Sequence, residues 1–266
     1  IIGETSSEFY RKDEVLQKAL PKALAVITNA EIIKERISFF YRILKDRIYV
    51  INQQPSFIID KFKKIEESDL NNFKKLYQLP QNYIFYPAMY LPHKNHRAII
   101  DSIKILKYKL NLNFSVVFCG NDIGYLKNLK DYVLKEKLEK NIIFLDFIED
   151  KYLPYFYLNS FALVMPALIG PTNIPPWEAF KMGVPVIYSR SDGIEEVLGN
   201  AVYYVDPLNP EDIAKGIKEI FENKKLKENL IAKGKEKLSE VESKHEFKQF
   251  FEIIKKHSSL KKTFEF

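Results

Sequence analysis

Residues 170–187 read Gly170-Pro-Thr-Asn-Ile-Pro-Pro-Trp-Glu178-Ala-Phe-Lys-Met-Gly183-Val-Pro-Val-Ile187 and predict a loop, a helix and a strand in succession. The run before them, 161–165, is short and apolar, as expected of a buried strand in a parallel sheet. Thr172 or Asn173 can cap the helix, the two adjacent prolines are tolerated in its first turn, and Gly183 can end it. A buried strand followed by a helix and a second buried strand predicts a parallel α/β fold.

The start of this predicted helix has the build of an anion site. Prolines carry no N–H, so the donors at the turn are the amides of Thr172, Asn173 and Ile174. These amides and the positive end of the helix dipole can hold a phosphate. Glu178 follows one turn later, where it can accept hydrogen bonds from a sugar hydroxyl, although the dipole alone also favours a glutamate there.

The run Glu178-Ala-Phe-Lys-Met-Gly183-Val-Pro185-Val resembles the donor-site signature of the retaining GT-B glycosyltransferase family (glycosyl transferases group 1). It matches the family's second glutamate and the residues that follow it, whereas the family's first glutamate falls on Gly170 and is absent. The resemblance implies a nucleoside-diphosphate sugar as donor substrate, no required cofactor, and a ribose-binding role for Glu178.

Apolar runs and helical periodicity alternate along most of the chain. Predicted strands lie at 23–28, 48–51, 83–86, 114–118, 142–145, 162–165, 185–187 and 201–205, and predicted helices at 8–20, 30–45, 57–77, 94–109, 123–138, 150–159, 175–182, 193–198 and 210–222, before a polar helical tail. This alternation predicts an α/β protein with a doubly wound parallel sheet. The resemblance implies that the sheet is Rossmann-like and forms the C-terminal half of a GT-B fold.

The resemblance also implies a division of the chain into three parts. We expect residues 1–52 to be the C-terminal remnant of an acceptor-side domain, because Ala25-Val-Ile-Thr-Asn-Ala30 matches the family's last strand there. Residues 53–240 would be the nucleotide-sugar-binding domain and 241–266 a helical tail. Since the chain starts at Ile1 without an initiator methionine, we expect it to be an excised piece of a longer protein.

A second constellation, Tyr86-Pro-Ala-Met-Tyr-Leu-Pro92-His-Lys94-Asn-His96, follows the predicted strand 83–86. Open α/β sheets bind ligands at this end of their strands. The resemblance places a phosphate-binding lysine at Lys94, and an arginine at the position that Met89 occupies here. A fixed cation would stabilise the charge that a departing nucleoside diphosphate gains. The alternative is a solvated lysine at the start of the next helix.

His93 and His96 form a His-x-x-His pair beside this lysine. No cysteine, aspartate or further histidine nearby completes the three or four ligands of a metal site, so we expect no metal and interpret both as surface or helix-capping residues. His93 remains a candidate contact to the donor because of its place next to Lys94.

Two further strand ends carry candidate donor contacts. Gly120 ends the strand 114–118 and allows the backbone to approach closely, either to a ligand or to a packed helix. The resemblance places a donor contact there and places the base beside Ile148, through backbone groups next to Phe147. Glu149 and Asp150 are interpreted as helix N-capping residues.

Asp192-Gly193-Ile-Glu195-Glu196 matches the family's loop in the sugar-proximal region. Two adjacent carboxylates could carry out acid-base chemistry. The preferred interpretation is that both are acids of a first helical turn.

Composition limits the other classes of function. Lys plus Arg number 41 against 35 Asp plus Glu, which gives a charge of +6. This mild excess suits anionic substrates or an anionic membrane surface, although a lysine-rich coding bias is the preferred explanation, and nothing predicts nucleic-acid binding. No run approaches the ~20 apolar residues that span a bilayer. The single cysteine, Cys119, fits a reducing compartment, so we expect a cytoplasmic protein, with the inner face of a membrane left open.

The predicted helix 30–45 carries a basic and aromatic cluster made of Arg36, Phe39, Phe40, Arg42 and Ile43. Such a cluster leaves open a peripheral contact with a membrane. A stripe that faces the core, with a solvated basic edge, is the preferred interpretation.

Together these residues predict the donor-binding portion of a glycosyltransferase. It would transfer a sugar with retention from a nucleoside-diphosphate sugar to an acceptor hydroxyl, and a glycan or lipid-linked acceptor would bind through the missing domain. The resemblance implies that the leaving phosphate assists deprotonation of the acceptor, so no catalytic residue is assigned. Two alternatives remain: a non-catalytic nucleotide-sugar-binding module, and a GT-B nucleotide-sugar epimerase, which would need a carboxylate near residue 170.

Overall fold

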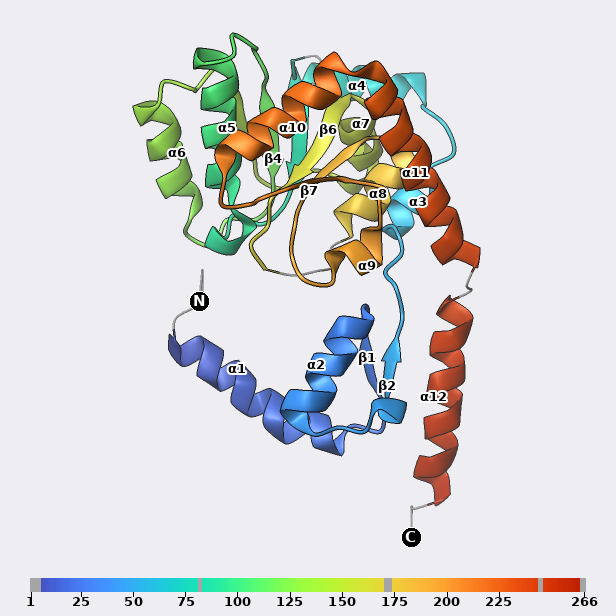
Figure 1. Ribbon diagram of the computed structural model, residues 1–266. Coiled ribbons are helices and arrows are strands. Elements are labelled where there is room, and N and C mark those ends of the chain that lie inside the picture. The colour runs from blue at the N-terminus through green and yellow to red at the C-terminus, as the bar shows by residue number, and fades with distance from the viewer. Residues whose placement is uncertain (1–5, 81–82, 170–173, 244–245, 264–266) are drawn as a thin grey trace.

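The computed structural model describes residues 6–80, 83–169, 174–243 and 246–263 and has two parallel sheets (Figure 1). The larger sheet has the strand order β5-β4-β3-β6-β7-β8. Its strands are β3 (Tyr83–Pro87), β4 (Val116–Cys119), β5 (Ile142–Leu145), β6 (Ser160–Met165), β7 (Val186–Ser189) and β8 (Tyr203–Val205). The predicted α/β, doubly wound parallel sheet is therefore confirmed.

Helices cover both faces of this sheet (Figure 1). On one face lie α5 (His96–Tyr108), α6 (Leu126–Lys135) and α10 (Pro210–Glu222). On the other lie α3 (Phe57–Lys61), α4 (Glu67–Tyr77), α7 (Leu153–Leu158), α8 (Pro175–Met182) and α11 (Lys224–Ser243). The buried strands read as continuous apolar runs because both faces are covered. We call residues 57–243 the six-stranded unit.

A smaller unit precedes it in the chain. Its parallel strands β1 (Val26–Thr28) and β2 (Ile48–Val50) pair with Val26 opposite Ile48. The helices α1 (Ser6–Ala19) and α2 (Glu31–Tyr41) flank them, and we call residues 6–50 the two-stranded unit. The last helix, α12 (Glu246–Thr263), returns to this unit, where His257 Nε2 lies 3.4 Å from Tyr49 Oη (Figure 1).

The order of strands determines where a ligand can bind. From β3 the chain moves outward through β4 to β5, then crosses back to β6 and moves outward on the other side through β7 to β8. The carboxyl ends of β3 and β6 are therefore neighbours whose following loops diverge to opposite faces. In open α/β sheets, ligands bind in the crevice at this reversal.

The predicted elements agree closely with the structure in the six-stranded unit. The strand 142–145 and the helices 175–182 and 210–222 have the predicted bounds. The predicted helix 57–77 was wrong, because the chain forms α3 and α4 with a break between them. Within that break the Phe62 ring packs edge-on against Tyr155, and the backbone N–H of Glu66 donates to the Tyr155 hydroxyl. These tertiary contacts override the local helical periodicity.

A glycine sets the distance between α11 and α8. A Cβ placed on Gly234 would lie 2.5 Å from Cδ1 of Phe180, whose ring is buried. We expect Gly234→Ala to lower the free energy of unfolding by about 1–2 kcal/mol, because overpacking outweighs the gain in helix propensity. Chemical denaturation would measure this change. The exposed Ser239 on the same helix is the matched control, and Ser239→Ala should stay within about 0.5 kcal/mol of the wild type. A stabilised Gly234→Ala protein would contradict this packing.

Candidate functional site

Three loops meet at the reversal between β3 and β6. The Leu168 backbone N–H donates to the His93 carbonyl at 2.9 Å, which joins the loop after β6 to the loop after β3. The Asn95 side chain donates to the carbonyl oxygens of Pro166 at 3.0 Å and of Pro207 at 2.7 Å. Asn95 itself has a left-handed backbone with φ of 59°, which asparagine tolerates better than most residues. One side chain thereby connects the loops after β3, β6 and β8 at the carboxyl edge of the sheet.

Lys94 lies in this crevice, at the end of the single 3₁₀ turn Pro92–Lys94. Its carbonyl accepts a hydrogen bond of 2.8 Å from the Tyr86 hydroxyl, and its N–H bonds to Leu91, so the backbone around it is fixed. Burial lowers the pKa of the Lys94 ammonium from its ordinary value of 10.5. A half-buried cation interacts more strongly with an anion than a fully solvated one does.

The helix α5 begins directly after Lys94, and α8 follows the loop after β6; both helix starts lack a side-chain cap. The N-cap residues are Asn95 for α5 and Ile174 for α8, and neither side chain caps the helix. The positive dipole ends of both helices favour an anion at this edge of the sheet. The first turn of α8 adds no free amide of its own, because Pro175 and Pro176 carry no N–H and the amides of Trp177 and Glu178 donate to Ile174. The predicted Pro-Pro first turn of α8 and its left-handed Gly183 end, with φ of 69°, are confirmed. The predicted anion-binding residues Thr172 and Asn173, and also Gly170, lie outside the described residues.

The prediction that His96 is a surface or capping residue was wrong. Its ring is fully buried among Tyr86, Tyr90 and Phe118, with centroid distances of 4.9, 5.2 and 5.0 Å. Neither ring nitrogen makes a hydrogen bond of good geometry, and burial lowers the pKa of His96 to about 3, against a weaker opposing effect of the Ala88 backbone. His96 is therefore a neutral part of the crevice floor. The polar spacing around Lys94 gave no sign of this burial, because the aromatic rings come from two strands and a loop.

Gly120 serves the close approach of two neighbouring loops. A Cβ on Gly120 would lie 2.2 Å from the Ala88 carbonyl oxygen. The loops run side by side here, since the Ala88 N–H donates to Cys119 at 2.9 Å and the Tyr90 N–H to Asn121 at 3.1 Å. The absence of a side chain at this position thus keeps the segment that leads to Lys94 close to the end of β4.

Glu178 lies in the first turn of α8 and is buried. The Tyr157 hydroxyl, on α7, donates to Glu178 Oε2 at 2.7 Å. Burial and then the nearby Glu178 charge raise the pKa of Tyr157, so its hydroxyl remains a donor at every ordinary pH. Sequence reasoning missed Tyr157, whose only signal was its place on an apolar helix before the strand β6.

The remaining candidates line the rim of the crevice. Ile148 is buried in the core, so only its backbone can reach a ligand, whereas the Phe147 side chain is 72% exposed. Other apolar side chains on the loops at this edge are also exposed, namely Met89, Ile123, Ile169, Ile174 and Leu208. Glu149 lies at the expected N-cap position of the 3₁₀ turn Asp150–Tyr152, with Asp150 in its first turn, but the Glu149 side chain makes no capping hydrogen bond and pairs with Lys151 at 3.0 Å.

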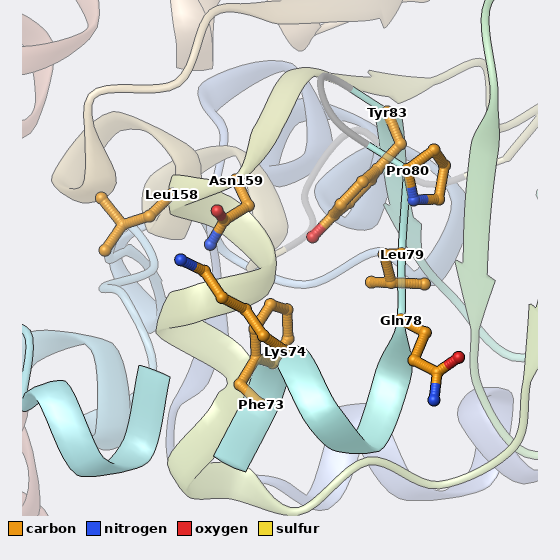
Figure 2. A pocket seen from close by; sticks show the side chains of 8 residues that line it. All are labelled: Phe73, Lys74, Gln78, Leu79, Pro80, Tyr83, Leu158 and Asn159. Carbon is orange, nitrogen blue, oxygen red and sulfur yellow. The ribbon is translucent and has the colours of Figure 1, made fainter. Parts of the chain in front are cut away.

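A cavity of about 520 Å³ lies at the opposite end of β3, between α4 and the end of α7 (Figure 2). Its walls include Phe73, Lys74, Tyr83 and Asn159. It contains none of the predicted site residues, so it is separate from the crevice.

Within the described ranges there is no group of three or more His, Cys, Asp or Glu side chains placed to hold a metal ion. None of the helices that the structure describes is long and apolar enough to cross a membrane.

Comparison with known proteins identifies relatives of this fold and sequence. Residues 67–237 match the sequence profile of the family described as glycosyl transferases group 1. The O-antigen chain mannosyltransferase RfbU of Salmonella typhimurium is 27% identical over 221 residues, which cover 80% of this chain and 58% of that protein. The O-antigen chain mannosyltransferase B of Escherichia coli is 25% identical over 242 residues, which cover 86% of this chain and 61% of that protein. The chain therefore spans less than two thirds of the length of these curated relatives.

Solved structures share the fold at low sequence identity. A glycosyltransferase from Rickettsia africae superimposes with a TM-score of 0.75 at 18% identity and covers 96% of this chain and 69% of its own. Anabaena Alr3699/HepE, in complex with UDP and glucose, has a TM-score of 0.77 at 17% identity, and the match covers 95% of this chain and 68% of HepE. Both likenesses extend over the two-stranded and six-stranded units together.

Burial of neutral His96 has a consequence for stability in acid. The unfolded chain takes up a proton near pH 6.5, whereas the folded chain does so only near pH 3. The contribution of His96 to the free energy of unfolding is therefore fully present above pH 6.5. It falls by up to about 1.4 kcal/mol per pH unit as the pH drops towards 3. We expect His96→Phe to remove this part of the slope.

Chemical denaturation of wild type and His96→Phe from pH 8 down to pH 4.5 measures the effect. The difference at pH 8, where the histidine is neutral in both states, gives the packing cost of the substitution. Equal slopes for the two proteins below pH 6.5 would contradict the assigned burial of a neutral ring.

Proposed function

Because this chain belongs to the glycosyl transferases group 1 family, we propose that it is the nucleotide-sugar-binding portion of a glycosyltransferase. The reaction would move a sugar from a nucleoside-diphosphate sugar to an acceptor hydroxyl with retention. The observation that carries the proposal is the half-buried Lys94 at the reversal of strand order, directly before the start of α5. This is the place and the charge that a diphosphate requires.

We propose that Lys94 and the amides of Thr172, Asn173 and Ile174 hold the diphosphate. As the bond from sugar to phosphate breaks, negative charge gathers on the leaving diphosphate, and a cation held in place stabilises that charge most in the transition state. His93 is proposed as a neighbouring donor contact, and its carbonyl already fixes the loop after β6 through Leu168.

We propose that Glu178 binds the ribose. The Tyr157 hydroxyl holds Oε2 of Glu178, so the carboxylate has a fixed orientation before a ligand arrives. For the base we propose the backbone of Ile148, and the exposed Phe147 ring adds an apolar face beside it. Gly120 contributes by keeping the loop of Ala88 close to β4.

The identity of the donor is a further proposal. RfbU and mannosyltransferase B are named mannosyltransferases, so a mannosyl nucleotide is the first donor to test. The HepE complex contains UDP and glucose, so uridine nucleotides are the second. No metal or other cofactor enters this proposal.

We also propose that residues 1–52 are the end of an acceptor-side domain, 53–240 the nucleotide-sugar-binding domain and 241–266 a helical tail. The two-stranded unit buries only Val26, Ile43 and Ile48 in its own cluster among the described residues, which is too little for an independent domain. A glycan or lipid-linked acceptor would bind through the preceding part of a longer protein.

We propose a cytoplasmic location with contact to a membrane surface, and the helix α2 supports the membrane contact. Phe39 and Phe40 are 78% and 71% exposed, so the preferred interpretation of a core-facing stripe was wrong for both. Exposed rings beside the exposed Arg42 suit a peripheral contact with an anionic membrane.

Isothermal titration of the purified chain with UDP, GDP and their glucose and mannose conjugates tests the function. We expect saturable binding of one nucleotide by the wild type. Lys94→Ala should bind it with about 10- to 100-fold lower affinity, because the variant loses one charge-assisted contact. The matched control is Lys227→Ala on α11. Burial lowers the pKa of Lys227 as it does that of Lys94, but Lys227 lies over the Phe161 ring, at the end of β6 that is away from the crevice.

The outcomes separate the proposed functions. No binding of any nucleotide by the folded chain would contradict the donor site. Binding without transfer, when the full-length protein is given donor and acceptor, would favour the nucleotide-sugar-binding module. Release or isomerisation of the sugar without an acceptor would favour an epimerase.

A further inference from the structure

A carboxylate of the six-stranded unit caps a helix of the two-stranded unit. The backbone N–H of Glu31 donates to Glu196 Oε1 at 2.6 Å, and that of Ile32 to Glu196 Oε2 at 3.3 Å. The N-cap residue of α2 is Ala30, whose side chain has no acceptor of its own. Glu196 lies in α9 (Ile194–Leu198), which faces the start of α2 (Figure 1). The capping group that the α2 sequence lacks thus comes from 165 positions further along the chain.

A second contact between the units lies one turn along α2. Arg36 Nη2 lies 2.6 Å from Asp192 Oδ2, in the loop that links β7 to α9. Ile32 and Arg36 are four residues apart, so they lie on the same side of the helix. Gly193 follows Asp192 with φ of 82°, and this turn lies between the two carboxylates that contact the same side of α2.

These polar contacts border a small apolar contact. Ala30 is fully buried and belongs to the core of the six-stranded unit, and Ile32 and Ile33 pack against that core. The apolar contact holds the start of α2 in place, whereas Glu196 and Asp192 bind its exposed side. The Arg36 and Asp192 side chains are 45% and 76% exposed, so water and salt compete with their pairing.

We propose that Glu196, Asp192 and Arg36 form a reversible latch that sets the angle between the two units across the crevice. Capping by Glu196 and the Arg36–Asp192 pair favour the arrangement seen here, in which α2 is held against the loop after β7. The packing of Ala30 acts as the pivot and remains when the latch opens. That the latch controls access to a nucleotide-sugar crevice rests on the proposed function, but its existence does not.

The latch can be tested by a distance measured between the units in this chain. Spin labels at Lys22→Cys, in the two-stranded unit, and Lys225→Cys, on α11, would report the distance by pulsed electron paramagnetic resonance. Both sites are exposed, whereas Cys119 is buried and its pKa is raised to about 12 by burial, so it will not react with the label. We expect one narrow distance distribution in the wild-type background at low salt.

Glu196→Ala combined with Asp192→Asn should add a second, separated distance population and shift the ratio of the two populations by about 5- to 30-fold, the effect of losing a cap and an exposed ion pair. The matched control is Glu195→Ala, whose carboxylate pairs with Arg190 of its own unit at 2.7 Å, and it should leave the distribution unchanged. Exchanging the charges with Arg36→Asp and Asp192→Arg should restore the narrow distribution that Arg36→Asp alone loses.

The result that overturns the latch is an unchanged distance distribution in the Glu196 and Asp192 double variant, or equal broadening in the Glu195 control. Titration of the same proteins with UDP and GDP separates the two proposals. Altered distances without any nucleotide binding would support the latch and contradict the proposed function. Nucleotide binding with unaltered distances would support the proposed function and contradict the latch.

Discussion

The hydrogen bonds of the Asn95 amide are the interaction on which the crevice depends most. The amide donates to two carbonyl oxygens, on the loops after β6 and β8, while its backbone turns the chain from Lys94 into α5. Because the order of strands reverses between β3 and β6, the loops that follow these strands have no helix between them. The Asn95 side chain therefore joins these loops by hydrogen bonds at the carboxyl edge of the sheet.

The floor below this edge is aromatic and neutral, and its neutrality matters for the charge above it. His96 remains uncharged at ordinary pH, and the Tyr90 hydroxyl is used for hydrogen bonds to the Phe118 and Leu145 carbonyls. The described rings of this cluster therefore add no negative charge beneath Lys94. An aromatic floor of low polarity strengthens the attraction between a cation at this edge and an anionic ligand.

Most of the fold and part of the site could be predicted from the sequence, for local reasons. The bounds of α8 follow from Pro175, Pro176 and Gly183, each of which allows or ends a helix by its own backbone chemistry. The burial of His96, the break between α3 and α4 and the partner of Glu178 could not be predicted. Each depends on aromatic residues from other elements, and these meet only when the sheet has formed. Periodicity carries information about an element's own face and not about which element will cover it.

Glu178 and Glu196 show why the same local rule leads to different roles. Both lie in the first turn of a helix that follows a parallel strand, and the helix dipole favours a carboxylate at both places. Glu178 is buried, so the cost of desolvation requires a partner, and Tyr157 supplies it within the same unit. Glu196 is exposed and needs no partner, so its oxygens are left to cap α2 in the other unit. Because a buried carboxylate must keep its partner, Glu178 suits the proposed role of a binding residue with a fixed orientation. Because water can replace the partner of an exposed carboxylate, Glu196 suits the proposed role of a contact that opens and closes.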